Sequence, residues 1–181
     1  MSVAVALKEN DIVFVGVDNR VSGENVYHDV NEKPLKAVVL ENGIVLALAG
    51  NPGLFPYYIE EMGKLEDIDE DSIRNKAVYK VKEIINNQKL CYSDRQHELI
   101  IAYKDKAYSL NDLGYLEEIF KMRAIGSGEE VALGSLFTSV GANMSAEDKV
   151  IKAIQCAGEV VNSVSKTGWV INTKDRVFKQ F

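Results

Sequence analysis

The sequence has few of the residues that build metal centres and disulfide frameworks. Its 181 residues include two cysteines and two histidines. Cys91 and Cys156 lie far apart in the chain and form no disulfide framework, so we expect two buried thiols. His28 and His97 have no partner at the spacing of zinc ligands, and we expect them at the surface or in packing contacts. The sequence therefore predicts no metal site and no cofactor.

Long hydrophobic runs and an excess of positive charge are also missing. No apolar run reaches the roughly 18 residues that span a membrane, and no charged stretch leads into a short hydrophobic segment as in secretory signals. The net charge is -6 and the pI is about 5.1, which argues against nucleic acid as a partner because that binding depends on clustered Lys and Arg. With 46% hydrophobic and 27% charged residues, the composition is typical of a soluble globular protein. We expect a cytoplasmic protein with no membrane partner.

The chain also lacks any break that would divide it. No change of composition, internal repeat or low-complexity segment interrupts the sequence. The length suits one domain that buries about two thirds of its unfolded surface. We therefore predict a single domain over residues 1–181.

The first fifty residues predict two hairpins of apolar strands. The predicted strands are residues 3–8, 12–17, 36–40 and 44–49. The second hairpin turns at Asn42-Gly43, where glycine supplies the positive φ of a tight turn. Strands that are apolar on both faces must be covered on both sides, and this favours a sandwich with outer helices.

The rest of the chain alternates between helices and strands. Helices are predicted at 52–65, at 71–89, from 126–128 to about 139, and from Ser145 onward. Ser145 is followed at the spacing of a capping box by Asp148. Further strands are predicted at 98–103, 106–110, 122–125, 169–173 and 176–180.

Ser2 is a candidate nucleophile that uses its own amino group as the base. A serine hydroxyl is a poor nucleophile until a base takes its proton, and an α-amino group with a pKa of about 8 can do so. This requires Ser2 to be the first residue of the mature chain, and a small second residue normally permits removal of Met1. Many proteins without such activity also begin with Met-Ser, so the neighbouring residues have to support the hypothesis.

Three residues are expected to lie near Ser2. Asp18 ends the second strand, and in an antiparallel hairpin that end lies beside the start of the first. Lys36 begins the third strand, beside Gly50 at the end of the fourth. A lysine here would favour an ionised hydroxyl, Asp18 would orient that lysine, and the Gly50 N–H could bind an oxyanion. The alternatives are a strand-end cap for Asp18, a solvated lysine and a turn glycine.

The chain resembles proteasome β-type subunits and HslV-type peptidases, which are N-terminal nucleophile (Ntn) hydrolases. Residues 2–20 carry that family's hydroxyl residue, two strands, acid and basic tail, with Asp18 sixteen residues after Ser2. Residues 36–50 resemble its lysine strand running into an Ala-Gly turn. Residues 124–128, 132–134 and 144–158 resemble its later signature. The likeness covers nearly the whole chain.

This resemblance implies an α+β fold, a four-layer αββα sandwich of two antiparallel sheets between helices. It also implies a threonine-type endopeptidase activity with Ser2 as nucleophile and its amine as base. Lys36 and Asp18 would give electrostatic support, Gly50 would donate to the oxyanion, and Ser127 would hydrogen-bond to the amine. Taken alone, Gly126-Ser127-Gly128 also resembles a phosphate cradle, but it lacks the lysine and glycine spacing of a P-loop.

The resemblance extends to substrate and partners. Four residues occupy places that would line the substrate pocket: Val21, Ser22, Leu48 and Pro52. The implied assembly is a ring-shaped homo-oligomer of two stacked rings. An AAA+ unfoldase would feed it unfolded polypeptide.

Several departures from the family's pattern leave alternatives open. The nucleophile is Ser rather than Thr, and the interval from Asp18 to Lys36 is two residues longer than usual. An insertion near residues 29–34 makes Lys33 a rival for the catalytic lysine. Asn162 stands where proteasome subunits carry an Asp, and Ser165 matches a nearby serine. The alternatives to a peptidase are a catalytically silent ring subunit that binds partners, favoured if Met1 is retained, and a small-molecule amidase.

Overall fold

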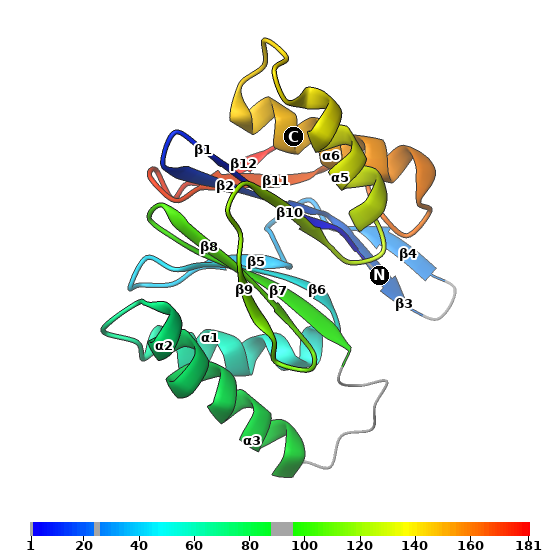
Figure 1. Cartoon of the computed structure of the whole chain (residues 1–181). Helices are drawn as coiled ribbons and strands as arrows, with labels where there is room; N and C mark the ends of the chain where they lie inside the picture. Colours follow the sequence, from blue (N-terminus) through cyan, green and yellow to red (C-terminus); the bar gives the residue numbers. More distant parts are fainter. Residues whose placement is uncertain (1, 24–25, 88–95) are drawn as a thin grey trace.

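The computed structural model describes residues 2–23, 26–87 and 96–181, which form four layers (Figure 1). Two antiparallel sheets face each other, and helices cover the outer face of each sheet. The predicted αββα sandwich is therefore confirmed. No helix within the described ranges is long and apolar enough to cross a lipid bilayer.

The first sheet contains the beginning of the chain. Its strands lie in the order β10 (Met122–Ile125), β1 (Ala4–Glu9), β2 (Ile12–Asp18), β11 (Gly168–Asn172) and β12 (Lys179–Gln180). β1 pairs with β2 so that Ala4 lies opposite Val17. The register places the start of β1 beside Asp18, as the hairpin pattern predicts. β1 is also an inner strand, so ladders on both sides hold the first residues.

The second sheet lies below the first in Figure 1. Its strands lie in the order β5 (Ala37–Val39), β6 (Val45–Gly50), β7 (His97–Tyr103), β8 (Lys106–Asn111) and β9 (Leu116–Glu118). A separate small hairpin, β3 (Arg20–Gly23) with β4 (Val26–Asp29), follows directly after β2. The sequence analysis did not predict β3, β4 or β9. Each has three or four residues, too few for a clear alternation of apolar and polar side chains.

The helices form the two outer layers. The second sheet is covered by the 3-10 turn η1 (Pro52–Leu54), α1 (Phe55–Gly63), α2 (Glu70–Ser72), the π-helical η2 (Ile73–Val78) and α3 (Tyr79–Asn87). The first sheet is covered by α5 (Glu129–Ser139) and α6 (Ala146–Val160). The predicted cap of α6 is present, since Asp148 N–H donates to Ser145 Oγ at 3.0 Å.

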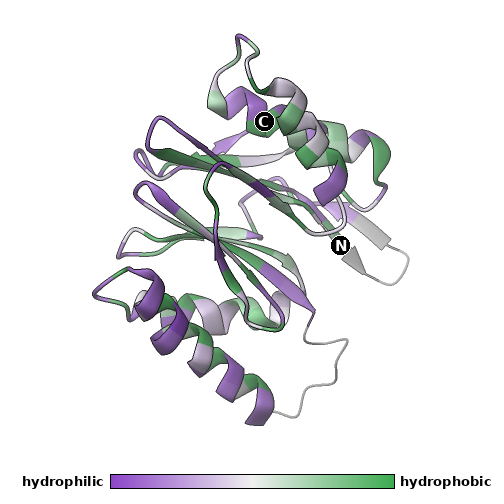
Figure 2. Ribbon diagram, in the orientation of Figure 1, coloured by the Kyte–Doolittle hydropathy of each residue, from purple (hydrophilic) through white to green (hydrophobic). Residues whose placement is uncertain are grey.

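The hydrophobic core has three parts, one for each interface between layers. One lies under α1 and α3, one between the sheets, and one under α5 and α6. Among the described residues, seven of the fifteen buried members of the middle part are alanine, against one of nineteen under α1 and α3. Small side chains let the two sheets approach closely. Figure 2 shows hydrophobic stretches on the strands and a helix α3 that alternates between hydrophilic and hydrophobic residues.

Some local predictions need correction. The last strand covers Lys179–Gln180 rather than 176–180, because Arg176 has a φ of +57° that ends the extended backbone. Cys156 is half-buried rather than buried, and Ser135 Oγ lies 3.5 Å from its Sγ between α5 and α6. Cys91 and the last two residues of the predicted helix 71–89 lie outside the described residues. His97 is buried, and His28 is exposed.

Candidate active site

The carboxylate of Asp18 is the centre of a hydrogen-bonded network beside Ser2. Its Oδ1 accepts from Val3 N–H at 2.9 Å and from Lys36 Nζ at 2.6 Å. Its Oδ2 accepts from the backbone N–H groups of Arg20 at 3.0 Å and Ser165 at 3.1 Å. The Asp18 side chain is fully buried. A buried carboxylate with donors on both oxygens holds a fixed orientation, and the residue next to Ser2 is one of those donors.

Ser2 lies at the entrance of β1 and is buried. The ladder between β1 and β2 continues to it, because Asp18 N–H donates to the Val3 carbonyl at 3.2 Å. The Ser2 carbonyl accepts from Ser127 Oγ at 3.3 Å and from Gly128 N–H at 3.4 Å. The Ser2 carbonyl is thus held by the turn at Ser127 and Gly128, and the neighbouring Val3 is held by β2.

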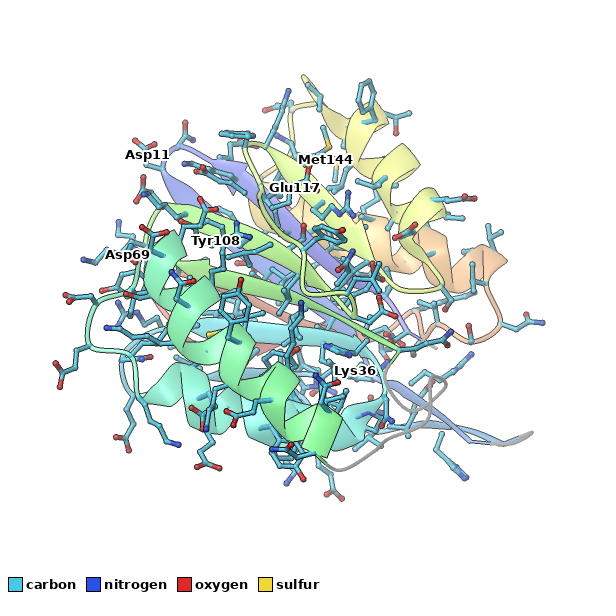
Figure 3. The ribbon with its side chains drawn as sticks, turned by 60° about the horizontal axis from the view of Figure 1, so that its bottom comes forward. Asp11, Lys36, Asp69, Tyr108, Glu117 and Met144 are labelled. Atoms are coloured by element: carbon cyan, nitrogen blue, oxygen red, sulfur yellow. The ribbon has the colours of Figure 1, made fainter. Side chains whose placement is uncertain are left out.

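Lys36, not Lys33, is the lysine that contacts Asp18. Lys33 is exposed, whereas the Lys36 side chain is 13% exposed and forms the ion pair. Lys36 precedes β5, and its carbonyl accepts from Leu48 N–H at 2.8 Å, which fixes it beside β6. Figure 3 shows Lys36 far from the labelled Asp11 and Asp69, which mark the other end of the sandwich.

Burial is the main influence on the Lys36 ammonium. Loss of solvation lowers the pKa of Lys36, the charge and hydrogen bond of Asp18 raise it, Asp29 raises it further, and Arg20 lowers it. The net pKa of Lys36 lies below the usual value for lysine. The ammonium therefore releases its proton more readily than a solvated lysine does.

Ser127 belongs to a turn that approaches Ser2 closely. Ser127 Oγ lies 3.1 Å from Ser163 Oγ in addition to its bond to the Ser2 carbonyl. The preceding Gly126 has a φ of +89°, and a Cβ there would collide with the Ser2 carbonyl oxygen. Only glycine permits both this backbone conformation and this approach. Gly126 N–H donates to Glu98 Oε2 at 2.9 Å, which ties the turn to the second sheet.

Gly50 faces Ser2 from the second sheet. It ends β6 with a φ of +108° and pairs with His97 of β7. A Cβ at Gly50 would lie 2.5 Å from the Gln96 carbonyl oxygen, so this position also requires glycine. Gly50 lines the same cleft as Ser2.

The cleft between Ser2 and Gly50 has a volume of about 610 Å³. Four of the predicted site residues line it: Ser2, Gly50, Pro52 and Ser127. Six further polar residues of its wall were not identified from the sequence, and three of these are ionisable: His97, Glu98 and Asp112. His97 and Glu98 lie on β7, which pairs with β6, and Asp112 follows β8, which pairs with β7. No local pattern in the sequence indicates that neighbourhood.

The structure supports the wall of the cleft from behind. The Tyr58 hydroxyl lies 2.7 Å from His97 Nε2, and both side chains are buried. Burial and then the charge of Asp112 raise the pKa of Tyr58, so this hydroxyl stays protonated at neutral pH. The contact anchors the cleft wall to helix α1.

Two of the predicted pocket residues do not line this cleft. Leu48 is buried against helix α1, because the cleft opens beyond the end of β6 and Leu48 lies two residues before that end. Val21 lies on β3 and is 40% exposed. The side chain of Ser22, the remaining predicted pocket residue, lies outside the described part of the structure.

Comparison with known proteins identifies relatives of this fold. The model of the proteasome subunit family matches residues 2–174. Thiobacillus denitrificans BPH superposes with a TM-score of 0.77 and 15% identity, covering 94% of this chain and 96% of that chain. The structure of Thiobacillus denitrificans BPH in complex with epoxomicin superposes with a TM-score of 0.76 and 15% identity, covering 94% of this chain and 97% of that chain. Eukaryotic HslV from Trypanosoma brucei superposes with a TM-score of 0.75 and 17% identity, covering 94% of this chain and 98% of that chain. No curated protein matches the sequence.

Proposed function

The chain belongs to the proteasome subunit family, and from this membership we propose that it is a peptidase subunit with Ser2 as its N-terminal nucleophile. One observation supports the proposal above all. Asp18 Oδ1 binds both Lys36 Nζ and the N–H of Val3, the residue that follows Ser2. A buried ion pair therefore lies beside the serine that lines the cleft of about 610 Å³.

The proposed reaction begins when removal of Met1 frees the α-amino group of Ser2. The neutral amine takes the proton of Ser2 Oγ, and the oxygen attacks the carbonyl carbon of a peptide bond. The carbonyl π electrons move to the oxygen, giving a tetrahedral intermediate. When this collapses, the carbon–nitrogen bond breaks, and the protonated α-amine gives its proton to the leaving nitrogen. An ester on Ser2 and a free amine product result.

A water molecule completes the cycle. The α-amine takes a proton from the water, whose oxygen attacks the ester carbon. The second intermediate collapses with cleavage of the bond to Ser2 Oγ, which recovers its proton from the amine. The product is a carboxylic acid, and Ser2 is regenerated.

The surrounding residues have separate roles in this proposal. The Lys36 ammonium lowers the cost of negative charge on Ser2 Oγ and disfavours protonation of the nearby amine. Asp18 orients Lys36. The N–H of Gly50 binds the oxyanion, and Ser127 hydrogen-bonds to the Ser2 amine once it is free.

The cleft is suited to an extended polypeptide. It runs between residues of the two sheets, with Ser2 and Ser127 on one side and Gly50 and Pro52 on the other. Family members form oligomeric rings. We propose that this chain forms a homo-oligomer of two stacked rings, acts in the cytoplasm on unfolded polypeptide, and receives it from an AAA+ unfoldase.

The experiment that tests the function examines the first residue and the activity together. Intact mass of the purified protein reports whether Met1 has been removed. Periodate cleaves the carbon–carbon bond of an N-terminal serine only when its α-amine is free, so it should convert an N-terminal Ser2 to an aldehyde, seen as a mass loss. Hydrolysis of a fluorogenic peptide by the same sample is expected. Peptide hydrolysis by protein that carries Met1 throughout would reject Ser2 as the nucleophile. Complete processing without any hydrolysis would favour the silent ring subunit.

A further inference from the structure

Two residues join Asp18 to a second carboxylate, Asp29 at the end of β4. Arg20 donates its backbone N–H to Asp18 Oδ2, and its side chain binds Asp29 through Nε at 2.8 Å and Nη2 at 3.2 Å. Ser165 donates its backbone N–H to Asp18 Oδ2 and its hydroxyl to Asp29 Oδ2 at 3.0 Å. Each residue therefore binds one acid through its main chain and the other through its side chain.

We propose that Asp29 is a positioning residue of the active site, which holds Asp18 and Lys36 in their working geometry by fixing Arg20 and Ser165. This role rests on the proposed peptidase function. Asp29 does not line the cleft, so it acts through the other residues and not on the substrate.

The geometry shows why one carboxylate can fix both residues. Arg20 lies on β3, and Ser165 lies in the segment between α6 and β11, so the two come from distant parts of the chain. Asp29 is the group that binds both of their side chains. Arg20 Nη1 also donates to the Asn162 carbonyl at 2.7 Å, which ties the β3–β4 hairpin to that segment. Without the Asp29 carboxylate, both backbone donors to Asp18 Oδ2 lose the side-chain partner that they share, while the bond of Arg20 to the Asn162 carbonyl and the contact of Ser165 with Thr167 Oγ1 remain.

Charge gives Asp29 a second effect on Lys36. The charged groups that act on Lys36 are Asp18 from β2, Asp29 from β4 and Arg20 from β3. In the proposed processed chain the Ser2 amine would join them. Asp29 raises the pKa of Lys36, and Arg20, with which Asp29 pairs, lowers it. Removing the charge of Asp29 should therefore lower the pKa of Lys36, because the opposing charge of Arg20 stays in place. The alkaline limb of activity should move to lower pH.

Replacement of Asp29 by asparagine tests the role in the processed, assembled protein. Displacement of a catalytic group by about 1 Å can lower the rate about a hundredfold. Asp29→Asn removes only one support of Asp18 and Lys36 and should displace them by less, so we expect kcat to fall roughly tenfold. KM should change less than about twofold, since Asp29 does not touch the cleft. The alkaline limb of the kcat profile should shift to lower pH, a change that loss of folded protein alone would not produce.

Glu147→Gln is the matched control. Glu147 is 28% exposed and pairs with Lys179 at 2.7 Å, while Asp29 is 34% exposed and pairs with Arg20 at 2.8 Å. Glu147 lines a different cleft from Ser2. Glu147→Gln should leave kcat and the pH profile as in the wild type. If Asp29→Asn behaves in the same way as this control, the positioning role is overturned.

A measurement without substrate separates this inference from the proposed function. Competitive acetylation with trace acetic anhydride, followed by peptide mass spectrometry, reports the fraction of neutral Lys36 at each pH. The midpoint for Lys36 should lie at lower pH in Asp29→Asn than in the wild type. If the wild type cleaves no peptide, the proposed peptidase function is rejected, but the two Lys36 midpoints still show whether the Asp29 charge acts on Lys36. The same midpoint in both proteins would contradict that effect of Asp29.

Ser165→Ala tests the bridge if Asp29→Asn does not fold. This variant removes one link between the two carboxylates and keeps every charge. It should lower kcat severalfold and leave the alkaline limb in place. A wild-type kcat in Ser165→Ala would show that the Ser165 bridge does not position Asp18.

Discussion

Lys36 Nζ lies 2.6 Å from Asp18 Oδ1, and the two side chains are 13% and 0% exposed. Water therefore screens this ion pair little, and its strength depends on the surrounding protein. The pair lies directly behind the residue that we propose as nucleophile.

Lys36→Ala should lower peptide hydrolysis by about a hundredfold or more, as does the loss of a group that stabilises charge in the transition state. Lys33→Ala is the control, because Lys33 is exposed and does not contact Asp18 in the structure. It should keep wild-type activity. Steady-state kinetics with a fluorogenic peptide would check both. Greater loss in Lys33→Ala would mean that another lysine conformation is the active one.

Ser2→Ala should abolish hydrolysis, because the variant has no nucleophilic oxygen. Size-exclusion chromatography should give the same assembly as the wild type, since the hydrogen bonds of Ser2 with the other described residues use its backbone carbonyl. Ser2→Thr should keep or increase activity, because the added methyl group restricts the hydroxyl to fewer rotamers. Unchanged turnover in Ser2→Ala would exclude this residue as the nucleophile.

Gly126→Ala should reduce both stability and activity. Gly141→Ala is matched to it, since the two glycines have φ values of +89° and +85° and a Cβ at Gly141 meets nothing within 4 Å. Gly141→Ala should lose about 1–2 kcal/mol of unfolding free energy from backbone strain alone. Gly126→Ala should lose about 1–3 kcal/mol more from the collision with the Ser2 carbonyl, with a lower kcat. Urea denaturation and peptide kinetics would measure both, and equal effects would contradict the collision.

The contribution of Asp29 to the free energy of unfolding should decrease at acid pH. The hydrogen bond from Arg20 is the main reason why the pKa of Asp29 lies below 3.8, with smaller effects of Ser165 and of the Arg20 and Lys36 charges, against the opposing effect of burial. A lowered pKa means that the stabilisation is complete above 3.8, the unfolded value, and disappears as the pH falls through the folded value.

Urea denaturation of wild type and Asp29→Asn at several pH values would check this dependence. The difference in unfolding free energy should stay constant well above pH 3.8 and shrink below it. A difference that is the same at every pH would show that the carboxylate charge is not the stabilising feature.

The sequence predicted those parts of the fold and site that depend on neighbouring residues. The two hairpins follow from local alternation and turn residues. Their registers place Asp18 beside the start of β1 and Lys36 beside β6, and the packing of the two sheets then brings Lys36 to Asp18. The wall formed by His97 and Glu98 could not be predicted, because β7 meets β6 across a long stretch of chain.

Asp29 was missed for a related reason. The strand that carries it has four residues, and its partner Ser165 lies 136 positions away. Pairing of two polar side chains at that separation leaves no periodic pattern in the sequence. Leu48 was expected in the wall of the cleft from the resemblance alone, whereas the structure packs it in the core under helix α1.

The alanine-rich interior has a consequence for enzyme engineering. Ser2 precedes β1 of one sheet and Gly50 ends β6 of the other, so the gap between the proposed nucleophile and the proposed oxyanion donor is set by the thickness of the layer that separates the sheets. A single extra methyl group at Ala47 or Ala102, neither of which lines the cleft, should push these two groups apart. The proposed activity should thus be adjustable from residues outside the cleft.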